Sequence, residues 1–138
     1  MKTYQGSCHC GAVRFEADID LAAGTTRCNC SICSKARAWF LLVPPDRVRL
    51  LAGADAHTEY RWVPGGRPSG AFLRYRFCKT CGIRTFGHGG DPAEKGAFFF
   101  VNVAALEIEH DELAAAPIRY VDGRHDRYDQ TPADTRLL

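Results

Sequence analysis

Apolar residues recur at every second position in two segments of the chain, a pattern typical of half-buried β-strands. In residues 11–19, the apolar face consists of Val13, Phe15, Ala17 and Ile19. Residues 71–77 alternate between apolar and mostly basic side chains and lead directly into Cys78. Both segments are therefore predicted to be strands with one face in the core.

Three further segments predict strands without clear alternation. Residues 39–43 and 97–103 are almost continuous apolar runs, which favours strands that are buried. The first run ends before Pro44, which cannot donate a hydrogen bond to a sheet. Residues 57–63 are also a strand candidate and precede a predicted turn at 64–66. The pattern as a whole predicts a mainly β fold.

Helical signals are weak, and the remaining segments are rich in loop-forming residues. Short helical turns are predicted at residues 31–36 and 106–115. Loops are expected at 52–56, 64–70 and 87–96, because glycine, proline and aspartate gather in these segments. The fold class expected is therefore β with few short helices.

Length and composition exclude several classes of protein. The 138 residues contain no repeat or linker, so residues 1–138 are expected to form a single domain, with a loose tail at 130–138. A net charge of +2 is too small to indicate nucleic-acid binding. No segment approaches the roughly 18 apolar residues of a membrane span. Because no apolar signal segment is visible near Met1, the cytoplasm is the expected location.

The cysteines add candidate chemistry. Seven cysteines form three tight clusters, C-H-C, C-N-C-S-I-C and C-K-T-C. An odd number leaves one cysteine over in any disulfide scheme, and a disulfide between neighbours in C-x-C would be strained. Short clusters instead suit the binding of one metal ion by neighbouring thiolates. The sequence therefore predicts zinc. With seven thiolates and two Zn²⁺, the formal charge of the chain would become −1.

Two of the clusters complement each other as a closed zinc site. Cys78 and Cys81 supply two ligands, and Cys8 and Cys10 would complete the four that a structural zinc requires. A glycine follows each of these two clusters and permits a positive φ in the turn. His9 is an alternative ligand, although adjacent side chains on extended backbone point apart.

The third cluster, Cys28, Cys30 and Cys33, is one ligand short of a closed tetrahedron. Three protein ligands and one open position are the arrangement of a catalytic zinc, and the open position accepts water or a thiol. We expect this second zinc to be the more exposed and more easily removed. The alternative is a structural site closed by a distant histidine, His57, His88 or His110.

Basic residues flank the third cluster. Arg27, Lys35 and Arg37 lie next to it in the sequence. A zinc ion with three thiolates has a formal charge of −1, so these cations would stabilise it and could hold the carboxylate of a ligand. They are the candidate ligand-binding residues, and the alternative is that they are ordinary surface residues.

The three cysteine clusters with their flanking residues resemble the glutathione-dependent formaldehyde-activating enzyme family, which includes centromere protein V. The resemblance is carried, in order over about residues 4–125, by GSCHCGAVRF (6–15), CNCSICSK (28–35) and FCKTCG (77–82), with VNV (101–103) and DG (122–123). It implies an Mss4-like, zinc-stapled fold similar to a β-sandwich. It also implies a structural zinc on Cys8, Cys10, Cys78 and Cys81, and a catalytic zinc on Cys28, Cys30 and Cys33.

The activity implied by this resemblance is that of a carbon–sulfur lyase of the S-(hydroxymethyl)glutathione synthase type. Such an enzyme adds glutathione, or a similar thiol, to formaldehyde or a related small aldehyde. Asn29 departs from the family, which often has histidine between the two cysteines. A non-catalytic zinc scaffold and a zinc enzyme acting on another thiol remain alternatives. The expected partners are small molecules, without nucleic acid or membrane, and the oligomeric state is open.

Overall fold

The computed structural model describes residues 1–63 and 72–138, and in these residues the chain forms two β-sheets. The small sheet has the order β1 (Lys2–Ser7), β2 (Arg14–Ile19) and β5 (Val48–Ala52). The large sheet has the order β10 (Ile118–Val121), β3 (Thr25–Cys28), β4 (Trp39–Val43), β9 (Phe98–Asn102), β8 (Arg84–Gly89), β7 (Leu73–Cys78) and β6 (His57–Trp62). Strands β10 and β3 pair in parallel, and the other pairs are antiparallel.

Helices are few and short, as expected. The α-helices are α1 (Ser31–Ala36) and α2 (His110–Ala114), and single 3₁₀ turns occur at η1 (Leu21–Ala23), η2 (Pro45–Arg47), η3 (Val103–Ala105) and η4 (Gly123–His125). None of the described helices is long and apolar enough to cross a lipid bilayer. The prediction of a mainly β fold with few short helices is confirmed.

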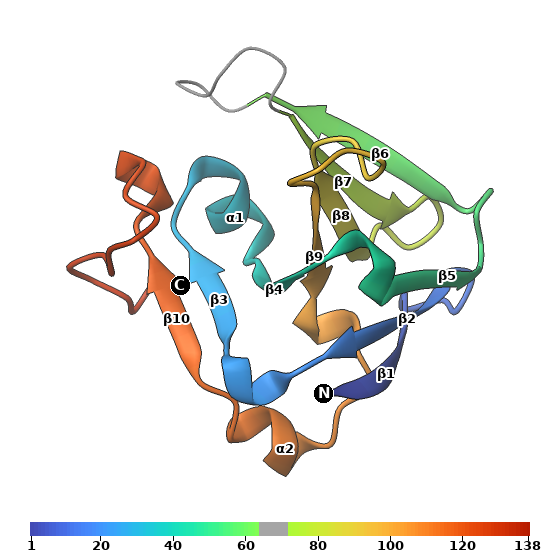
Figure 1. The fold of residues 1–138 in the computed structure, drawn as a ribbon, viewed down its shortest axis with the longest axis horizontal. Coiled ribbons are helices and arrows are strands. Elements are labelled where there is room, and N and C mark those ends of the chain that lie inside the picture. Colours follow the sequence, from blue (N-terminus) through green and yellow to red (C-terminus); the bar gives the residue numbers. More distant parts are fainter. Residues whose placement is uncertain (64–71) are drawn as a thin grey trace.

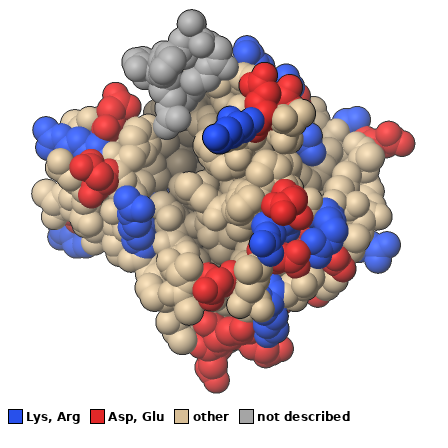
Figure 2. Space-filling model, in the orientation of Figure 1, with Lys and Arg blue, Asp and Glu red and all other residues tan. Residues whose placement is uncertain are grey.

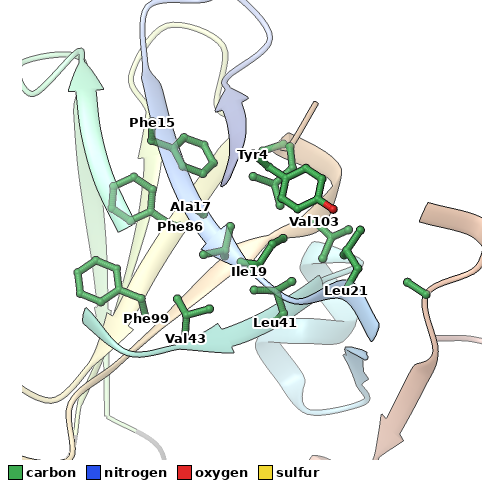
Figure 3. Packing of buried hydrophobic residues seen from close by; sticks show 14 residues of the cluster. Tyr4, Phe15, Ala17, Ile19, Leu21, Leu41, Val43, Phe86, Phe99 and Val103 are labelled. Carbon is green, nitrogen blue, oxygen red and sulfur yellow. The ribbon is translucent and has the colours of Figure 1, made fainter. Parts of the chain in front are cut away.

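The main core lies between the two sheets. Phe15 from β2 is fully buried, and its ring contacts that of Phe86 from β8 with centroids 5.2 Å apart. Tyr4 from β1 and Leu41 and Val43 from β4 join the same cluster (Figure 3). Burial of each large side chain contributes about 1.5–3 kcal/mol to the stability of the fold. The packing of this cluster therefore holds the small sheet against the large one.

The large sheet is divided into two halves by the positions of its strands. Figure 1 shows β3 and β10 on the left and β6 to β8 on the right, connected through β4 and β9. Helix α1 follows β3 and lies between the halves in this view. This arrangement places the third cysteine cluster, at the end of β3 and in α1, opposite the strands β7 and β8.

Most of the predicted strands are confirmed, and the loop prediction for residues 87–96 is wrong at its start. Gly87 and Gly89 belong to β8, where they pair with Tyr75 and Leu73 of β7. Aromatic rings from the neighbouring strand cover these two glycines. No side chain is therefore needed at these positions to cover this face of the sheet. Strands β1, β3, β5, β8 and β10 were not predicted. The predicted turn 64–66 and loop 64–70 lie outside the described residues.

The C-terminal residues 130–138 contain no helix or strand, but hydrogen bonds connect them to the region of the third cysteine cluster. The guanidinium of Arg37 donates to the Leu137 carbonyl at 2.6 Å. The backbone N–H of Asp122 donates to the Gln130 carbonyl at 2.9 Å. The end of the chain is thus attached to the loop after α1 and to the end of β10.

Candidate metal centres and the adjoining cavity

The first group of cysteines consists of Cys8, Cys10, Cys78 and Cys81, whose sulfurs all lie within 4.8 Å of one another. The sulfurs of Cys8 and Cys10 are 3.6 Å apart, and those of Cys10 and Cys78 are 3.7 Å apart. Four thiolates bound tetrahedrally at about 2.3 Å from a zinc ion would be about 3.8 Å from each other. The donor set and its spacing therefore fit one zinc ion.

Two tight turns carry these four cysteines. Gly11 and Gly82 follow the two motifs with φ of 77° and 73°, a backbone conformation that glycine adopts without steric cost. Backbone N–H groups also point at the sulfurs, as from Val13 to Cys8 at 3.3 Å. Hydrogen bonds from backbone N–H groups lower the pKa of Cys81 to about 6. The turn that carries Cys81 therefore favours, at this residue, the thiolate form that binds zinc.

The second group consists of Cys28 at the end of β3, Cys30 at the start of α1 and Cys33 within α1. Their sulfurs also lie within 4.8 Å of one another. Contacts with Cys28 and then Cys33 lower the pKa of Cys30 to about 3, whereas contacts with Cys28 and Cys30 raise the pKa of Cys33. Three soft sulfur donors that converge on one point suit a zinc ion with an open position.

The second group differs from expectation in its exposure. Cys28, Cys30 and Cys33 are all buried, whereas Cys10 of the first group is exposed. The expectation that the second site is the more exposed is therefore wrong for the cysteines themselves. The cause is that β10, β4 and the turn at Gly123 pack around them, so their access is through a cavity rather than directly from the surface.

Neither group includes a histidine among the described residues. His9 is exposed and outside the first group. The ring of His57 hydrogen-bonds the Thr85 hydroxyl at 2.9 Å, and Nδ1 of His88 donates to the Gly90 carbonyl at 2.8 Å. His110 begins α2 and also belongs to neither group. The three-cysteine group is thus not closed by any of the histidines considered from the sequence.

Asn29 fastens the three-cysteine loop to the turn after β10. Its side-chain NH₂ group donates to the Asp122 carboxylate at 2.7 Å, and its side-chain oxygen accepts from the Arg124 backbone N–H at 2.8 Å. His125 donates from Nδ1 to the same carboxylate at 2.8 Å. These hydrogen bonds, from Asn29 first and His125 next, lower the pKa of the Asp122 carboxyl. A Cβ on Gly123 would lie 2.6 Å from the Cys28 sulfur, so only glycine fits there.

A cavity of about 450 Å³ opens beside the second group. Its wall includes all three of these cysteines and many aromatic rings, namely Trp39, Phe40, Trp62, Tyr75, Phe86, Phe98, Phe100 and Tyr128. The chain has two tryptophans, and both are in this wall. Figure 2 shows a hollow at the corresponding place, between the two halves of the large sheet, bordered largely by residues that are neither acidic nor basic.

The basic residues of the cavity are not the three expected from the sequence. Arg76 and Arg84 line it, whereas Arg27, Lys35 and Arg37 do not. Arg27 stacks on the outer part of Trp39, with its guanidinium 4.8 Å from the ring centroid. Arg37 binds the Leu137 carbonyl, and Lys35 is exposed on α1.

A register shift between β7 and β8 accompanies the position of Arg76 in the cavity wall. The register between β7 and β8 shifts between Tyr75 and Phe77, and both Tyr75 and Arg76 line the cavity. Strict alternation would have placed these neighbours on opposite faces. Arg84, at the start of β8, stacks on the Tyr75 ring at 5.0 Å and has no acidic partner within 4.0 Å among the described residues. Its half-buried guanidinium is therefore available to an anionic group in the cavity.

The fold and the two cysteine groups define a class of small, mainly β proteins with two candidate zinc sites, one of them beside a ligand-sized cavity. The chain belongs to the glutathione-dependent formaldehyde-activating enzyme family, whose model matches residues 3–121. It is also similar to the crystal structure of a Rhodobacter sphaeroides protein determined as a structural genomics target. The two share 31% sequence identity with a TM-score of 0.62, over 83% of this chain and 99% of the other.

Proposed function

We propose that the protein catalyses the reversible addition of a thiol, with glutathione the leading candidate, to a small aldehyde such as formaldehyde. The sulfur forms a bond to the carbonyl carbon, the π electrons of C=O move to oxygen, and this oxygen takes up the proton that the thiol has lost. The reverse reaction breaks the carbon–sulfur bond, as in a carbon–sulfur lyase. The observation that carries the proposal is the three-cysteine group in the wall of a ligand-sized cavity.

Cys28, Cys30 and Cys33 would hold a catalytic zinc, and Cys8, Cys10, Cys78 and Cys81 a structural one. Zinc on Cys28, Cys30 and Cys33 would supply Lewis acidity, which lowers the pKa of a thiol bound to it. The protein itself contributes a pocket in which few water molecules compete for the thiol and the aldehyde. We propose the cytoplasm as the location, because thiols stay reduced there.

Tyr75 is the proposed hydrogen-bond donor for the carbonyl oxygen. It lines the same cavity as the three cysteines. Burial, and then the negative charge of Cys33, raise the pKa of Tyr75 well above its usual range, so its hydroxyl stays protonated. A neutral hydroxyl can stabilise the negative charge that develops on the carbonyl oxygen during the addition.

Arg84 is the proposed anchor for a carboxylate of the thiol substrate. Its backbone carbonyl accepts a hydrogen bond of 2.8 Å from the Asn102 side chain, which fixes the start of β8. The guanidinium lies over Tyr75, within reach of the cavity and without an acidic partner among the described residues within 4.0 Å. Glutathione has two carboxylates, so this unpaired cation gives the polar end of the substrate a place to bind.

The test is a calorimetric titration of the zinc-loaded protein with glutathione and with S-methylglutathione. We expect the free thiol to bind much more tightly, because only its sulfur can be deprotonated and reach the metal. Arg84→Gln should weaken glutathione binding about tenfold. Arg14→Gln, the same exchange on an exposed arginine of β2, should leave it unchanged. Equal affinities for the thiol and the thioether would contradict the proposal.

A further inference from the structure

The cavity is far larger than the smallest aldehyde requires. Formaldehyde consists of one carbon, one oxygen and two hydrogens, whereas a volume of about 450 Å³ lies in the range of pockets that enclose drug-sized ligands. The polar parts of glutathione have partners at Arg76 and Arg84, whereas most of the remaining wall is aromatic or aliphatic and, among the described residues, includes no acidic side chain. Much of the space next to the cysteines is therefore shaped for an apolar group.

The floor of this space is built by pairing glycines with aromatic rings. Phe100 lies over Gly87, where a Cβ would be 2.3 Å from the ring, and Phe98 lies over Gly89, where the distance would be 2.4 Å. The Tyr75 ring packs beside Phe100 with centroids 4.7 Å apart. The rings of Phe98 and Phe100 thus lie close to the strand that carries the glycines, and both line the cavity, where they offer aromatic surface to a ligand.

We infer that the aldehyde partner carries a bulky apolar group, and that an aromatic group fits best. This inference rests on the proposed addition of a thiol to an aldehyde. The sulfur of the adduct would lie at the three-cysteine group, and the apolar substituent on its carbon would occupy the space over Phe98 and Phe100. The bond changes are those of the simple addition: one S–C bond forms, and the carbonyl oxygen becomes a hydroxyl group with the proton of the thiol.

The test compares two stable thioethers that differ only in the group on sulfur, S-benzylglutathione and S-methylglutathione. Burial of the benzyl ring should make the first bind at least about tenfold more tightly to the zinc-loaded protein. Both tryptophans line the cavity, so binding of the benzyl compound should also change the intrinsic tryptophan fluorescence. Equal affinities, or tight binding without a change in this fluorescence, would overturn the inference.

A matched pair of variants tests whether the preference for the benzyl compound over the methyl compound arises at the floor of the cavity. Phe98→Ala removes part of the cavity floor and should abolish most of the benzyl preference, with little effect on S-methylglutathione. Phe72→Ala is the same exchange outside the cavity, where the ring contacts His88 and Arg61, and should keep the preference. Circular dichroism establishes that each variant is folded. A folded Phe98→Ala protein with an unchanged preference would overturn the inference, and the wild-type comparison decides it if that variant does not fold.

Two affinity ratios test this inference and the proposed function separately. Binding of free glutathione relative to S-methylglutathione reports whether the sulfur reaches the metal. The ratio of benzyl to methyl affinity reports only on the apolar space. A high benzyl preference without a preference for the free thiol would contradict the proposed function and leave the apolar site in place. The opposite result would leave thiol addition in place and overturn the inference about the aldehyde.

Discussion

Asn29 acts through hydrogen bonds, not through proton transfer. An asparagine side chain does not titrate, and both polar atoms of this one are engaged, one with Asp122 and one with the backbone of Arg124. The Ser34 hydroxyl, in turn, donates to the backbone carbonyl of Asn29 at 2.9 Å. Asn29, between two cysteines of the candidate metal centre, thereby fixes the path of the loop.

Replacing Asn29 with aspartate should weaken metal binding at the three-cysteine group. The new carboxylate would face that of Asp122, which now accepts a hydrogen bond of 2.7 Å, and the two negative charges would repel each other. Loss of a partner outside the ligand set typically reduces metal affinity about 10–100-fold. The measurement is the chelator concentration that removes the more labile zinc ion. Gln5→Glu, which creates a similar repulsion with Glu16 on the small sheet, should not change it.

Tyr75→Phe tests the hydroxyl group in the cavity. The phenylalanine ring keeps the contact with Phe100, so the fold and the binding of S-methylglutathione should be little affected. If the hydroxyl donates to the carbonyl oxygen in the transition state, the rate constant of thiol addition at saturating substrate should fall about tenfold. Tyr60→Phe, on an exposed tyrosine of β6, is the control. An unchanged rate in the Tyr75 variant would exclude this role.

At the scale of single residues, the sequence predicts metal ligands better than it predicts the pocket. The cysteine spacing alone suggested both groups, because ligands close in sequence can converge on one ion without knowledge of the rest of the fold. The candidate ligand-binding cations were chosen because they lie next to the third cysteine cluster in the sequence, and this criterion did not indicate Arg84. That residue is brought to the cavity by the pairing of β8 with β7, which no local pattern reveals.

At the scale of elements, strands were predictable where apolar residues alternate or run almost continuously over several positions. Residues 39–43 were predicted as a strand with the bounds that β4 has, and α1 also has the predicted bounds. Strand β8 was missed because its glycines mimic a loop. Strands β3 and β10 have four residues each and carry polar side chains, so too few positions are available for a periodic signal.

A pair of glycine variants tests the construction of β8. In Gly87→Ala, the new Cβ would lie 2.2 Å from the backbone oxygen of Arg74, and a strand would have to move. In Gly89→Ala, the nearest atoms belong to the side chains of Phe98 and Leu73, which can shift. We therefore expect Gly87→Ala to reduce the free energy of unfolding by about 1–3 kcal/mol, and Gly89→Ala by less. Chemical denaturation measures both, and the reverse order would contradict this account of the floor.

At the scale of the whole molecule, the two cysteine groups have different places in the fold. Cys8 and Cys10 lie between β1 and β2 of the small sheet, whereas Cys78 is the last residue of β7 in the large sheet and Cys81 lies in the turn between β7 and β8. One ion at this group would join the two sheets. The second group lies within residues 28–33, so an ion there links only neighbouring parts of the chain.

This difference predicts opposite outcomes for two cysteine-to-serine variants. Structural zinc contributes on the order of 10 kcal/mol of apparent binding energy in zinc-finger peptides, where it drives folding. Cys78→Ser removes a fully buried ligand from the group that joins the sheets, so the protein should be unfolded or insoluble. Cys30→Ser should lose one zinc ion per chain and the ability to bind glutathione, but should keep the β-sheet signal in circular dichroism.

Metal analysis and thermal unfolding together show which of the two cysteine groups loses its zinc ion first. The result is informative because the burial of the cysteines and the number of ligands predict opposite orders. The three-cysteine sulfurs are the more buried set, so exposure alone would predict that a chelator removes the ion at Cys10 first. Ligand number predicts the reverse order, because three thiolates hold zinc less firmly than four and the cavity admits a small chelator to the open position. We expect ligand number to decide, so that mild chelation removes one ion with little change in melting temperature. A large fall in melting temperature on loss of the first ion would assign the labile site to the cysteines that join the sheets.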